Sequence, residues 1–344
     1  MKAHPARKYA SSTDVARLAG VSQSAVSRTF TPGASVSAAT RAKVLQAASA
    51  LEYQPSIIPQ IMLSGKSKLI AVVLGGLGNP YYAEFLQELA QQLEPRGYKM
   101  IVLYAQSDYG FEVLAAQLAS YRVDAIISAL AVLSSTSASE LTAFKIPIIT
   151  FNSDERSPWI VSISANNRHA SAQMAQHLLA RGAKRFAFLC GPVDSPASQH
   201  RLAGFRTALQ QAGVEQLIVL QADHFTYESG FETTKQCFVE AGKPDAIYCA
   251  NDVLAMGAMD ALRFSLGLNV PKDVLVAGFD DIPEASWLSY DLTTITQPPV
   301  LLVKTALRVL EKMLAQPGQK QLSVTLKGEL VERSSTNRSS SRKA

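Results

Sequence analysis

The chain has 344 residues, of which 47% are hydrophobic, 18% charged and 8% aromatic, with a formal net charge of +5. This length is too great for one small domain, and the composition is typical of a protein with well-formed cores. No run of about 18 apolar residues occurs, and no apolar segment follows the basic start, so we expect neither a membrane span nor a secretory signal.

The positive charge is concentrated at the start of the chain. Residues 1–68 contain nine Lys or Arg against two acids, a net charge of +7, whereas the remaining 276 residues carry 24 basic and 26 acidic side chains, a net charge of −2. This asymmetry is the electrostatic footprint of a nucleic-acid-binding module, although a basic tail can also be merely solvated.

The three cysteines, Cys190, Cys237 and Cys249, lie too far apart to form a metal-type pair. We expect them to be small buried apolar residues in the reducing cytoplasm. No metal site and no cofactor is expected.

Residues 13–30, TDVARLAGVSQSAVSRTF, predict two short helices joined at a glycine. Ser12 or Thr13 is expected to cap the first helix, with Asp14 in its first turn. Gly20 is expected to supply the left-handed turn, because glycine adopts that conformation without steric cost. Ser22 is expected to cap the second helix, which buries Val26 and exposes Gln23, Ser24, Ser27 and Arg28.

A third helix is predicted over 38–53, capped by Ser37, with Val44, Leu45, Ala48 and Leu51 closing a thin three-helix core. Ala16 and Gly20, four residues apart, allow two helices to approach closely at a steep angle. This pattern is typical of a helix-turn-helix, whose second helix lies in the DNA major groove. An ordinary helical hairpin with scattered arginines is the alternative interpretation.

The segments DVARLAGVSQSAVSRTF and VSAATRAKVLQAASALEYQP closely resemble the headpiece of the lac-repressor and galactose-repressor family of bacterial transcription regulators. The similarity extends to the C-terminal GELVERSST and so covers nearly the whole chain. The resemblance implies a DNA-binding surface formed by Ser11, Thr13, Ser22, Gln23, Ser24, Ser27, Arg28, Ser35, Thr40 and Met62.

The resemblance also implies a hinge over 55–67, PSIIPQIMLSGKS, that folds on operator DNA. In the family an apolar side chain of this hinge inserts into the minor groove, and Met62 matches its position, which is usually leucine. Pro59 and Ser56 depart from the usual alanine and asparagine. Because proline is tolerated only in the first turn of a helix, the hinge helix must be short or start late. A plain Pro/Ser linker is the alternative.

From Lys68 onward, apolar runs alternate with amphipathic helical stretches. The runs are LIAVVLGGL, KMIVLYAQ, VDAIISAL and IPIITFNS, followed by RFAFLCGP, LIVLQAD, DAIYCAND and DVLVAGFDD. Unbroken apolar strands between helices favour parallel sheets covered on both faces. We therefore predict an α/β protein in which the headpiece and hinge precede two doubly wound lobes of periplasmic-binding-protein type, with LTTITQPP crossing between the lobes.

The predicted divisions are a headpiece at 1–54, a hinge at 55–67, a two-lobed effector-binding and dimerisation domain at 68–337 and a disordered tail at 338–344. Lobe 1 is expected to comprise about 68–166 plus 298–326, and lobe 2 about 167–297 plus 327–337. A two-fold symmetric operator requires a dimer, and the polar tail lacks the leucine heptads that make tetramers in some family members.

Ligands of doubly wound sheets bind outside the carboxyl ends of the strands. Amides, carboxylates, a guanidinium and aromatic rings follow the predicted strands and suit a small polyhydroxylated ligand. The resemblance assigns most of the same positions to the effector pocket. The candidate set is Asn79, Tyr81, Tyr82, Asn152, Arg201, Phe225, Asn251, Asp280 and Gln297.

Several of these residues have a simpler interpretation. Asp252 and Asp281 are also suited to capping the helices that follow them. Tyr81 and Tyr82 could belong to a core or a dimer surface, and Arg201 could be an exposed helix residue. Asn166 and Asn167 stand where the family usually has Asp-Asn, which puts a hinge or capping contact there in doubt.

An enzyme on a doubly wound scaffold, such as a dehydrogenase or sugar kinase, is one alternative function. A dinucleotide site requires G-x-G-x-x-G, but GGLGNPY has Tyr81 at the third glycine position, and no P-loop lysine or nucleophile elbow occurs. A transporter's solute-binding protein would need a signal peptide and would not need a helix-turn-helix.

The sequence therefore predicts a ligand-responsive repressor of carbohydrate or sugar-acid catabolism, whose partners are palindromic operator DNA, a small effector and a second copy of the chain. A purine effector is the alternative. In purine-binding relatives an arginine and a threonine occupy the positions of Ser195 and Ala197, so their absence favours a carbohydrate, with an acid slightly preferred.

Overall fold

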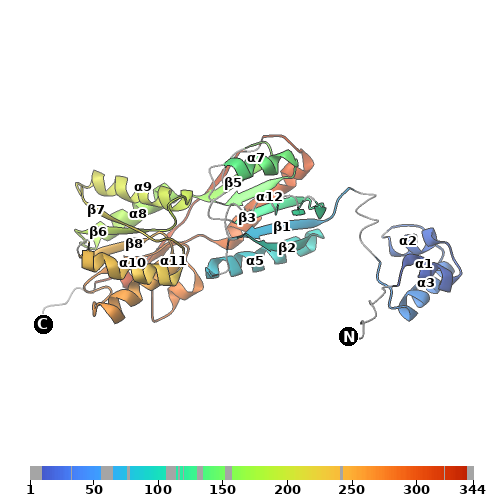
Figure 1. The fold of residues 1–344 in the computed structure, drawn as a ribbon, viewed down its shortest axis with the longest axis horizontal. Helices are drawn as coiled ribbons and strands as arrows, with labels where there is room; N and C mark the ends of the chain where they lie inside the picture. The colour runs from blue at the N-terminus through green and yellow to red at the C-terminus, as the bar shows by residue number, and fades with distance from the viewer. Residues whose placement is uncertain are drawn as a thin grey trace, which may run out of the picture. The chain divides into compact units, whose positions relative to one another are not determined.

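The computed structural model describes residues 10–31, 33–55, 65–75, 78–105, 114, 117–118, 120–129, 135–151, 157–240, 243–320 and 322–338. The chain divides into two compact units, Met1–Ser67 and Lys68–Ala344. The helices and strands of both are labelled in Figure 1.

The first unit contains the three predicted helices, α1 (Ser12–Ala19), α2 (Gln23–Phe30) and α3 (Ala38–Ala50). The cap of α1 is Ser11, so the prediction of Ser12 or Thr13 was wrong by one residue. Ser11 Oγ accepts from the backbone N–H of Asp14, and the Asp14 carboxylate accepts from the backbone N–H of Ser11. This reciprocal pair satisfies two donors that the first turn leaves without helical partners. Ser22 and Ser37 cap α2 and α3 as predicted.

The core of the first unit is small, as predicted, and consists of Val15, Ala16, Val26, Val44, Ala47 and Ala48. Gly20 adopts φ 65°, the left-handed conformation expected of it. Leu45, which we expected in this core, is 47% exposed. The exposure follows from helical periodicity, because Val44, Ala47 and Ala48 already occupy the inner face of α3 and Leu45 lies at its edge.

The second unit is built on two parallel sheets, as predicted. The larger has the order β11-β5-β4-β3-β1-β2 and the smaller β7-β6-β8-β9. The larger sheet comprises β1 (Leu69–Leu74), β2 (Lys99–Tyr104), β3 (Ala125–Ala129), β4 (Ile148–Phe151), β5 (Ile160–Ala165) and β11 (Val324–Leu326). The smaller comprises β6 (Phe186–Cys190), β7 (Leu217–Gln221), β8 (Ala246–Cys249) and β9 (Leu275–Ala277). Strands β5 and β11, which extend the larger sheet, were not predicted from the sequence.

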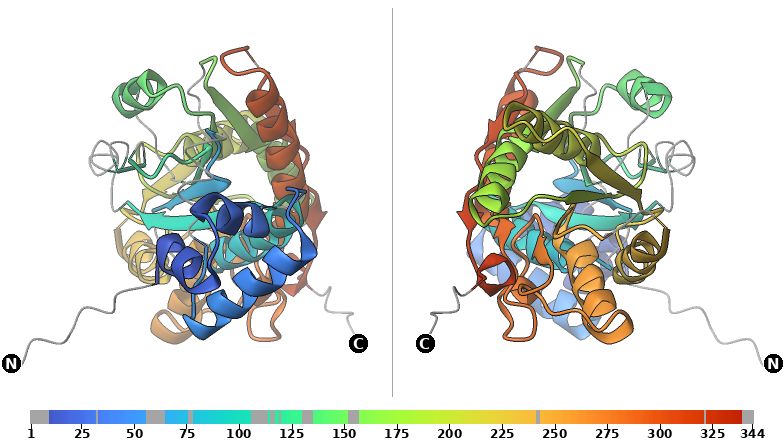
Figure 2. Two further views of the ribbon diagram at one scale, coloured as in Figure 1. Left: turned by 90° about the vertical axis from the view of Figure 1, so that its right-hand side faces the viewer. Right: turned by 90° about the vertical axis from the view of Figure 1, so that its left-hand side faces the viewer.

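Helices cover both sheets. They are α5 (Pro80–Leu93), α7 (Ser135–Ala143), α8 (Asn167–Ala180), α9 (Pro196–Gln211), α10 (Tyr227–Glu240), α11 (Asp252–Asp260) and α12 (Pro299–Ala315). Short helical turns lie at Glu94–Arg96, Ala261–Ser265, Pro283–Ser286 and Ser334–Thr336. In the lobe built on the smaller sheet, α8 packs with α9 on one side of the sheet and α10 packs with α11 on the other (Figures 1 and 2). In the lobe built on the larger sheet, α12 packs against α5.

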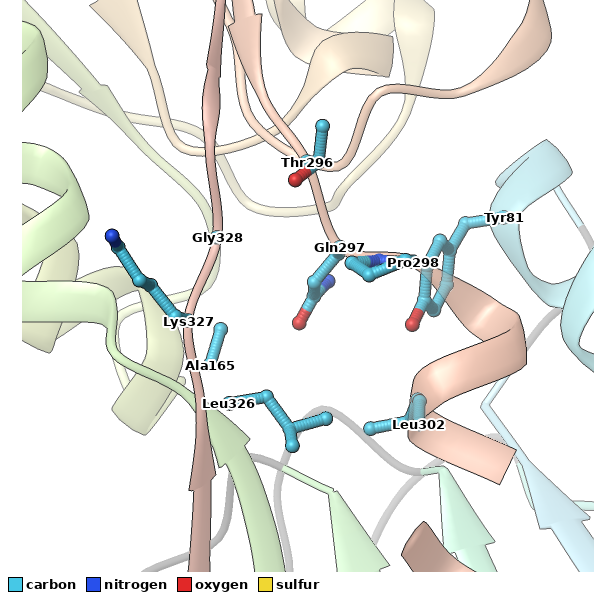
Figure 3. A pocket seen from close by; sticks show the side chains of 9 residues that line it. All are labelled: Tyr81, Ala165, Thr296, Gln297, Pro298, Leu302, Leu326, Lys327 and Gly328. Carbon is cyan, nitrogen blue, oxygen red and sulfur yellow. The ribbon is translucent and has the colours of Figure 1, made fainter. Parts of the chain in front are cut away.

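The chain passes between the two lobes at three places. These crossings are the junction of β5 with α8, the segment between β10 (Thr294–Ile295) and α12, and the segment between β11 and β12 (Leu330–Val331). Backbone hydrogen bonds connect the crossings to one another: Asn166 N–H donates to the Leu326 carbonyl over 2.8 Å, and Thr296 N–H donates to the Glu329 carbonyl over 2.8 Å. Hydrogen bonds therefore join the three crossings into one inter-lobe junction (Figure 3), which is distinct from the predicted hinge at 55–67.

The three cysteines are buried, as expected, and none of them forms a disulfide. Burial raises the pKa of the Cys190 thiol to about 11, so it remains a neutral apolar group. Over the part of the chain that the structure describes, no helix is both long enough and apolar enough to span a membrane.

Candidate DNA-binding surface and ligand-binding cleft

The exposed face of α2 carries the polar side chains that the sequence predicted. Gln23, Ser24, Ser27 and Arg28 are all exposed, whereas Ala25 and Val26 on the opposite face are buried. Gln23 Nε2 donates to Ser12 Oγ over 2.9 Å, which connects α2 to the first turn of α1. The face thus presents hydrogen-bonding groups on a helix whose position is set by the core beneath it.

The remaining described candidates of the DNA-binding set surround this helix at the starts of helices and in the loop before α3. Ser11 and Ser22 are the caps of α1 and α2, Thr13 and Ser35 are exposed, and Thr40 accepts a hydrogen bond from Ser37 Oγ over 2.8 Å. Met62, with Ser56 and Pro59, lies outside the described residues.

In the second unit, Arg201 lies in the second turn of α9 with only 4% of its surface exposed. This burial excludes the interpretation of Arg201 as a surface residue. Its Nε donates to Asn167 Oδ1 over 2.8 Å, its Nη1 donates to the Ala250 carbonyl over 2.5 Å, and the guanidinium lies 3.5 Å from the centre of the Phe279 ring. Three contacts from three elements therefore hold the guanidinium in one orientation.

Asp280 faces this arginine, with Oδ1 3.8 Å from Arg201 Nη1. Asp280 Oδ1 also accepts from Gln297 Nε2 over 2.8 Å, and Oδ2 accepts from Asn79 Nδ2 over 3.4 Å. Burial raises the pKa of Asp280 to about 6, opposed by the Arg201 charge and by the two amide donors. Its φ of 125° is strained for a residue other than glycine, and such strain is common at ligand sites. Three other candidate residues thus meet around the Asp280 carboxylate.

Asn251 is the cap of α11, where its side chain accepts from the backbone N–H of Leu254 over 2.9 Å. Asp252, for which the sequence left a capping role open, is not the cap and lies fully buried. It accepts from Thr294 Oγ1 over 2.6 Å and from the backbone N–H of Ile282 over 3.0 Å. Burial, reinforced by the nearby Asp280 charge, raises the pKa of Asp252 to about 7.

The aromatic candidates lie on opposite lobes of the unit. Tyr81 is buried and Tyr82 is half-buried on α5, with their rings in edge contact. Phe225 follows β7 and lies against Gly191, where an added Cβ would be 2.0 Å from the ring. Asn152 lies outside the described residues.

Two residues that contact Arg201, Asn167 and Phe279, were not predicted from the sequence to belong to the site. Asn167 was considered only for a hinge or capping contact; Asn166 in fact caps α8, and Asn167 orients Arg201. Phe279 is placed by the sequence analysis only in the apolar run DVLVAGFDD. Asn167 follows the end of β5 by two residues, so recognising that strand would have identified Asn167 as a candidate. Within the described ranges, no group of three or more His, Cys, Asp or Glu side chains is arranged to hold a metal ion.

Comparison with known proteins gives matches to both units. Residues 13–56 match the model of bacterial regulatory proteins of the lacI family, and residues 175–336 match a periplasmic binding protein-like domain. The ribose operon repressor of Escherichia coli strain K12 is 30% identical over 328 residues, covering 94% of this chain and 98% of the relative. The HTH-type transcriptional repressor PurR of Mannheimia succiniciproducens is 29% identical with the same coverage.

Solved structures are similar over the same length. The lac repressor dimer bound to operator and the anti-inducer ONPF has a TM-score of 0.84 at 29% identity, covering 96% of this chain and 99% of that one. A complex of the transcriptional regulator CelR with cellobiose has a TM-score of 0.71 at 27% identity, covering 95% and 99%.

Proposed function

Because this chain belongs to the lacI family of bacterial regulatory proteins, we propose that its first unit binds a palindromic operator as part of a homodimer and that a sugar or sugar acid in the second unit changes the affinity of that binding. The chain is a DNA-binding, ligand-responsive transcriptional regulator and not an enzyme, in line with the repressors to which it is similar.

For the DNA-binding unit, we assign base contacts to the exposed face of α2. A helix of this kind lies in the major groove, where Gln23, Ser24 and Arg28 reach base edges. The caps and exposed hydroxyls around α2 suit phosphate contacts. Met62 is assigned to the minor-groove wedge at the centre of the operator.

The observation that carries the ligand assignment is the buried Arg201–Asp280 pair, with both side chains only 5% exposed. Burying two charged groups costs free energy even when they are paired and hydrogen-bonded. Buried charged pairs with shifted pKa values are concentrated at functional sites, which supports a role for this pair in ligand binding. Hydroxyl groups suit this set, because the guanidinium donates hydrogen bonds and the carboxylate accepts them. The similarity to a ribose operon repressor and to a regulator in complex with cellobiose supports a carbohydrate.

A purine effector is the second candidate, which the similarity to a PurR repressor favours. Ser195 and Ala197 argue against it. Ser195 is 1% exposed and caps α9, where its hydroxyl accepts from the backbone N–H of Ser198. Ala197 has no polar side-chain atom. The two side chains therefore retain a single donor, the buried Ser195 hydroxyl, where the purine-binding relatives have an arginine and a threonine.

The test begins with a thermal-shift screen of sugars, sugar acids and nucleobases on the full chain. Operator affinity is then measured by fluorescence anisotropy with and without each hit. Arg201→Ala should abolish the response to effector while sparing operator affinity, because removing a charged hydrogen-bonding partner costs about 1.5–3 kcal/mol, a tenfold effect or more. Arg206→Ala, on the exposed side of the same helix, is the matched control and should respond normally.

Tight calorimetric binding of hypoxanthine or guanine, with no heat from any sugar or sugar acid, would replace the carbohydrate by a purine. An unaltered effector response in Arg201→Ala would remove the arginine from the site.

A further inference from the structure

Basic residues are concentrated in the turns that lead into four strands of the larger sheet. The turns at 65–68, 94–99, 121–124 and 143–147 precede β1, β2, β3 and β4, and together they contain six Lys or Arg against two acids. The exposed basic residues at or just before the strand starts are Lys68, Lys99, Arg122 and Lys145. The sheet therefore has a positive amino edge, although the chain beyond residue 68 carries a net charge of −2.

Strand pairing places these turns side by side. The four strands are neighbours in the sheet, in the order β4-β3-β1-β2. Lys99 N–H donates to the Lys68 carbonyl over 2.8 Å, and Asp124 N–H donates to the Leu69 carbonyl over 2.9 Å. Because neighbouring strands lie about 4.8 Å apart, the four strand starts span about 14 Å. A DNA strand presents one phosphate per about 3.4 Å of helix axis, so this edge matches a run of about four phosphates.

Three of the four cations are available to an outside anion. Within the part of the chain that the structure describes, no carboxylate pairs with Lys99, Arg122 or Lys145. Arg96 in the turn before β2 differs from them, because its Nε donates to Glu311 Oε1 over 3.1 Å.

The backbone of Arg122 and Lys145 is left-handed, with φ of 52° and 55°. Residues with a side chain adopt this conformation at a cost, whereas glycine does not. Glycine occupies the left-handed position of the turns before β2, β6 and β7, as Gly97, Gly182 and Gly213. The turns before β3 and β4 therefore carry a cation where other turns of the same unit carry glycine.

The helix dipole does not account for this choice. A cation is favourable at the end of a helix, but it need not occupy the left-handed position. At the end of α8 the cation is Arg181, with φ −82°, and the left-handed residue is the following Gly182. Arg122 and Lys145 instead place the charge on the strained residue itself, and such strain is concentrated at functional positions.

We propose that the amino edge of the larger sheet is a second DNA-binding surface, at which Lys68, Lys99, Arg122 and Lys145 contact the phosphates of a duplex. These contacts carry no sequence information, because every nucleotide has the same phosphate. Residues 55–67 tether this edge to the first unit and span at most about 45 Å in any conformation, which raises the local concentration of DNA that the first unit binds. The inference therefore rests on the proposed function.

The test compares the full chain with Arg122→Gly/Lys145→Gly on a random-sequence duplex of about 40 base pairs, by fluorescence anisotropy between about 50 and 200 mM KCl. Loss of two phosphate contacts should make the logarithmic salt slope shallower by about 1.8, so over this range the affinity of the natural protein should fall about tenfold more than that of the variant. The melting temperature of the variant should not fall, because glycine favours the left-handed backbone.

Two further variants separate contact from overall charge. Arg206→Gln/Lys272→Gln removes two exposed charges from the lobe built on the smaller sheet. It should leave the salt slope unchanged, because charges more than about 10 Å from the phosphates are largely screened at 0.1 M salt. Arg122→Lys/Lys145→Arg retains both charges and should also retain the slope.

Photo-crosslinking locates the DNA directly. p-Benzoylphenylalanine replaces Tyr121 or Phe144, which are 51% and 44% exposed and each precede one of the left-handed cations. Both positions should crosslink to the duplex on irradiation. Val193, which is 73% exposed in the loop after β6, should not. Polyglutamate at the same charge concentration, the probe for an acidic protein partner, should crosslink less than DNA.

The proposal is overturned if the glycine variant keeps the natural salt slope or melts at a lower temperature, or if Arg206→Gln/Lys272→Gln changes the slope equally. It is also overturned if neither aromatic position crosslinks to DNA, or if polyglutamate crosslinks as well as DNA does. Operator binding by the natural protein in any of these cases would retain the proposed function and remove only the second surface. A natural protein that binds no duplex would contradict both.

Discussion

Asp252 shows how one buried carboxylate makes stability depend on pH. The carboxyl is fully buried, with Thr294 and the backbone of Ile282 as donors and the Asp280 charge nearby. Because its pKa is raised to about 7, the folded protein retains a proton that the unfolded chain releases near the ordinary carboxyl value of 3.8. Stability contributed at this site is therefore lost as pH rises from about 4 to 7, and it is constant above that.

Asp252→Asn should remove this pH dependence. The amide oxygen can accept from Ile282 N–H and the amide nitrogen can donate to Thr294 Oγ1, so both contacts survive without a charge. We expect the variant to gain stability relative to the natural protein as pH rises from 5 to 8, measured by urea unfolding at each pH. Parallel stability curves for the two proteins would contradict the assignment, since other titrating groups cancel in the comparison.

Gly191 is predicted to set the position of Phe225. Its φ is not in the left-handed region, so alanine is acceptable to the backbone, but the new Cβ would lie 2.0 Å from the ring. Gly191→Ala should therefore displace the ring and weaken effector binding by about 1 kcal/mol, the scale of one aromatic contact. Calorimetry with the effector found in the screen measures the loss. In a Phe225→Ala background the same substitution should have no effect, and an equal loss there would indicate that Gly191 acts elsewhere.

At the scale of elements, the sharpest prediction concerns the exposed face of α2. Arg28 is exposed on its outer face, while Arg17 is exposed on α1 and pairs with Asp14. Arg28→Ala should weaken operator binding by about 1–3 kcal/mol and reduce discrimination against random DNA, as expected for a guanidinium on a base edge. Arg17→Ala is the matched control and should leave discrimination unchanged. Equal losses on operator and random DNA would place Arg28 on a phosphate.

At the scale of the whole molecule, the charge division matches the division into units. Residues 1–68 carry a net charge of +7, and the first compact unit ends at Ser67. Operator affinity should fall steeply and linearly on a logarithmic salt scale, because phosphate neutralisation releases counterions. Effector affinity, measured by calorimetry over the same salt range, should change far less because the Arg201–Asp280 pair is buried and poorly screened. A salt-independent operator affinity would contradict this division.

Local features were predictable because their partners lie close in sequence. The caps Ser22 and Ser37, the left-handed Gly20 and the exposed face of α2 depend on contacts within about one helical turn. The same local pattern misplaced the α1 cap by one residue, because neighbouring Ser11, Ser12 and Thr13 are all suitable caps and only the backbone geometry distinguishes them.

The sequence by itself also determined which side chains follow the strands, since parallel strands end at one edge of a sheet. That rule identified Asn79, Arg201 and Asp280 as candidates, and the structure brings them together. Their pairing was decided only by tertiary structure. Asn167 orients Arg201 across 34 residues, and Asn79 reaches Asp280 across 201. Such contacts depend on sheet order and on how the lobes fold against each other, and no spacing along the chain encodes them.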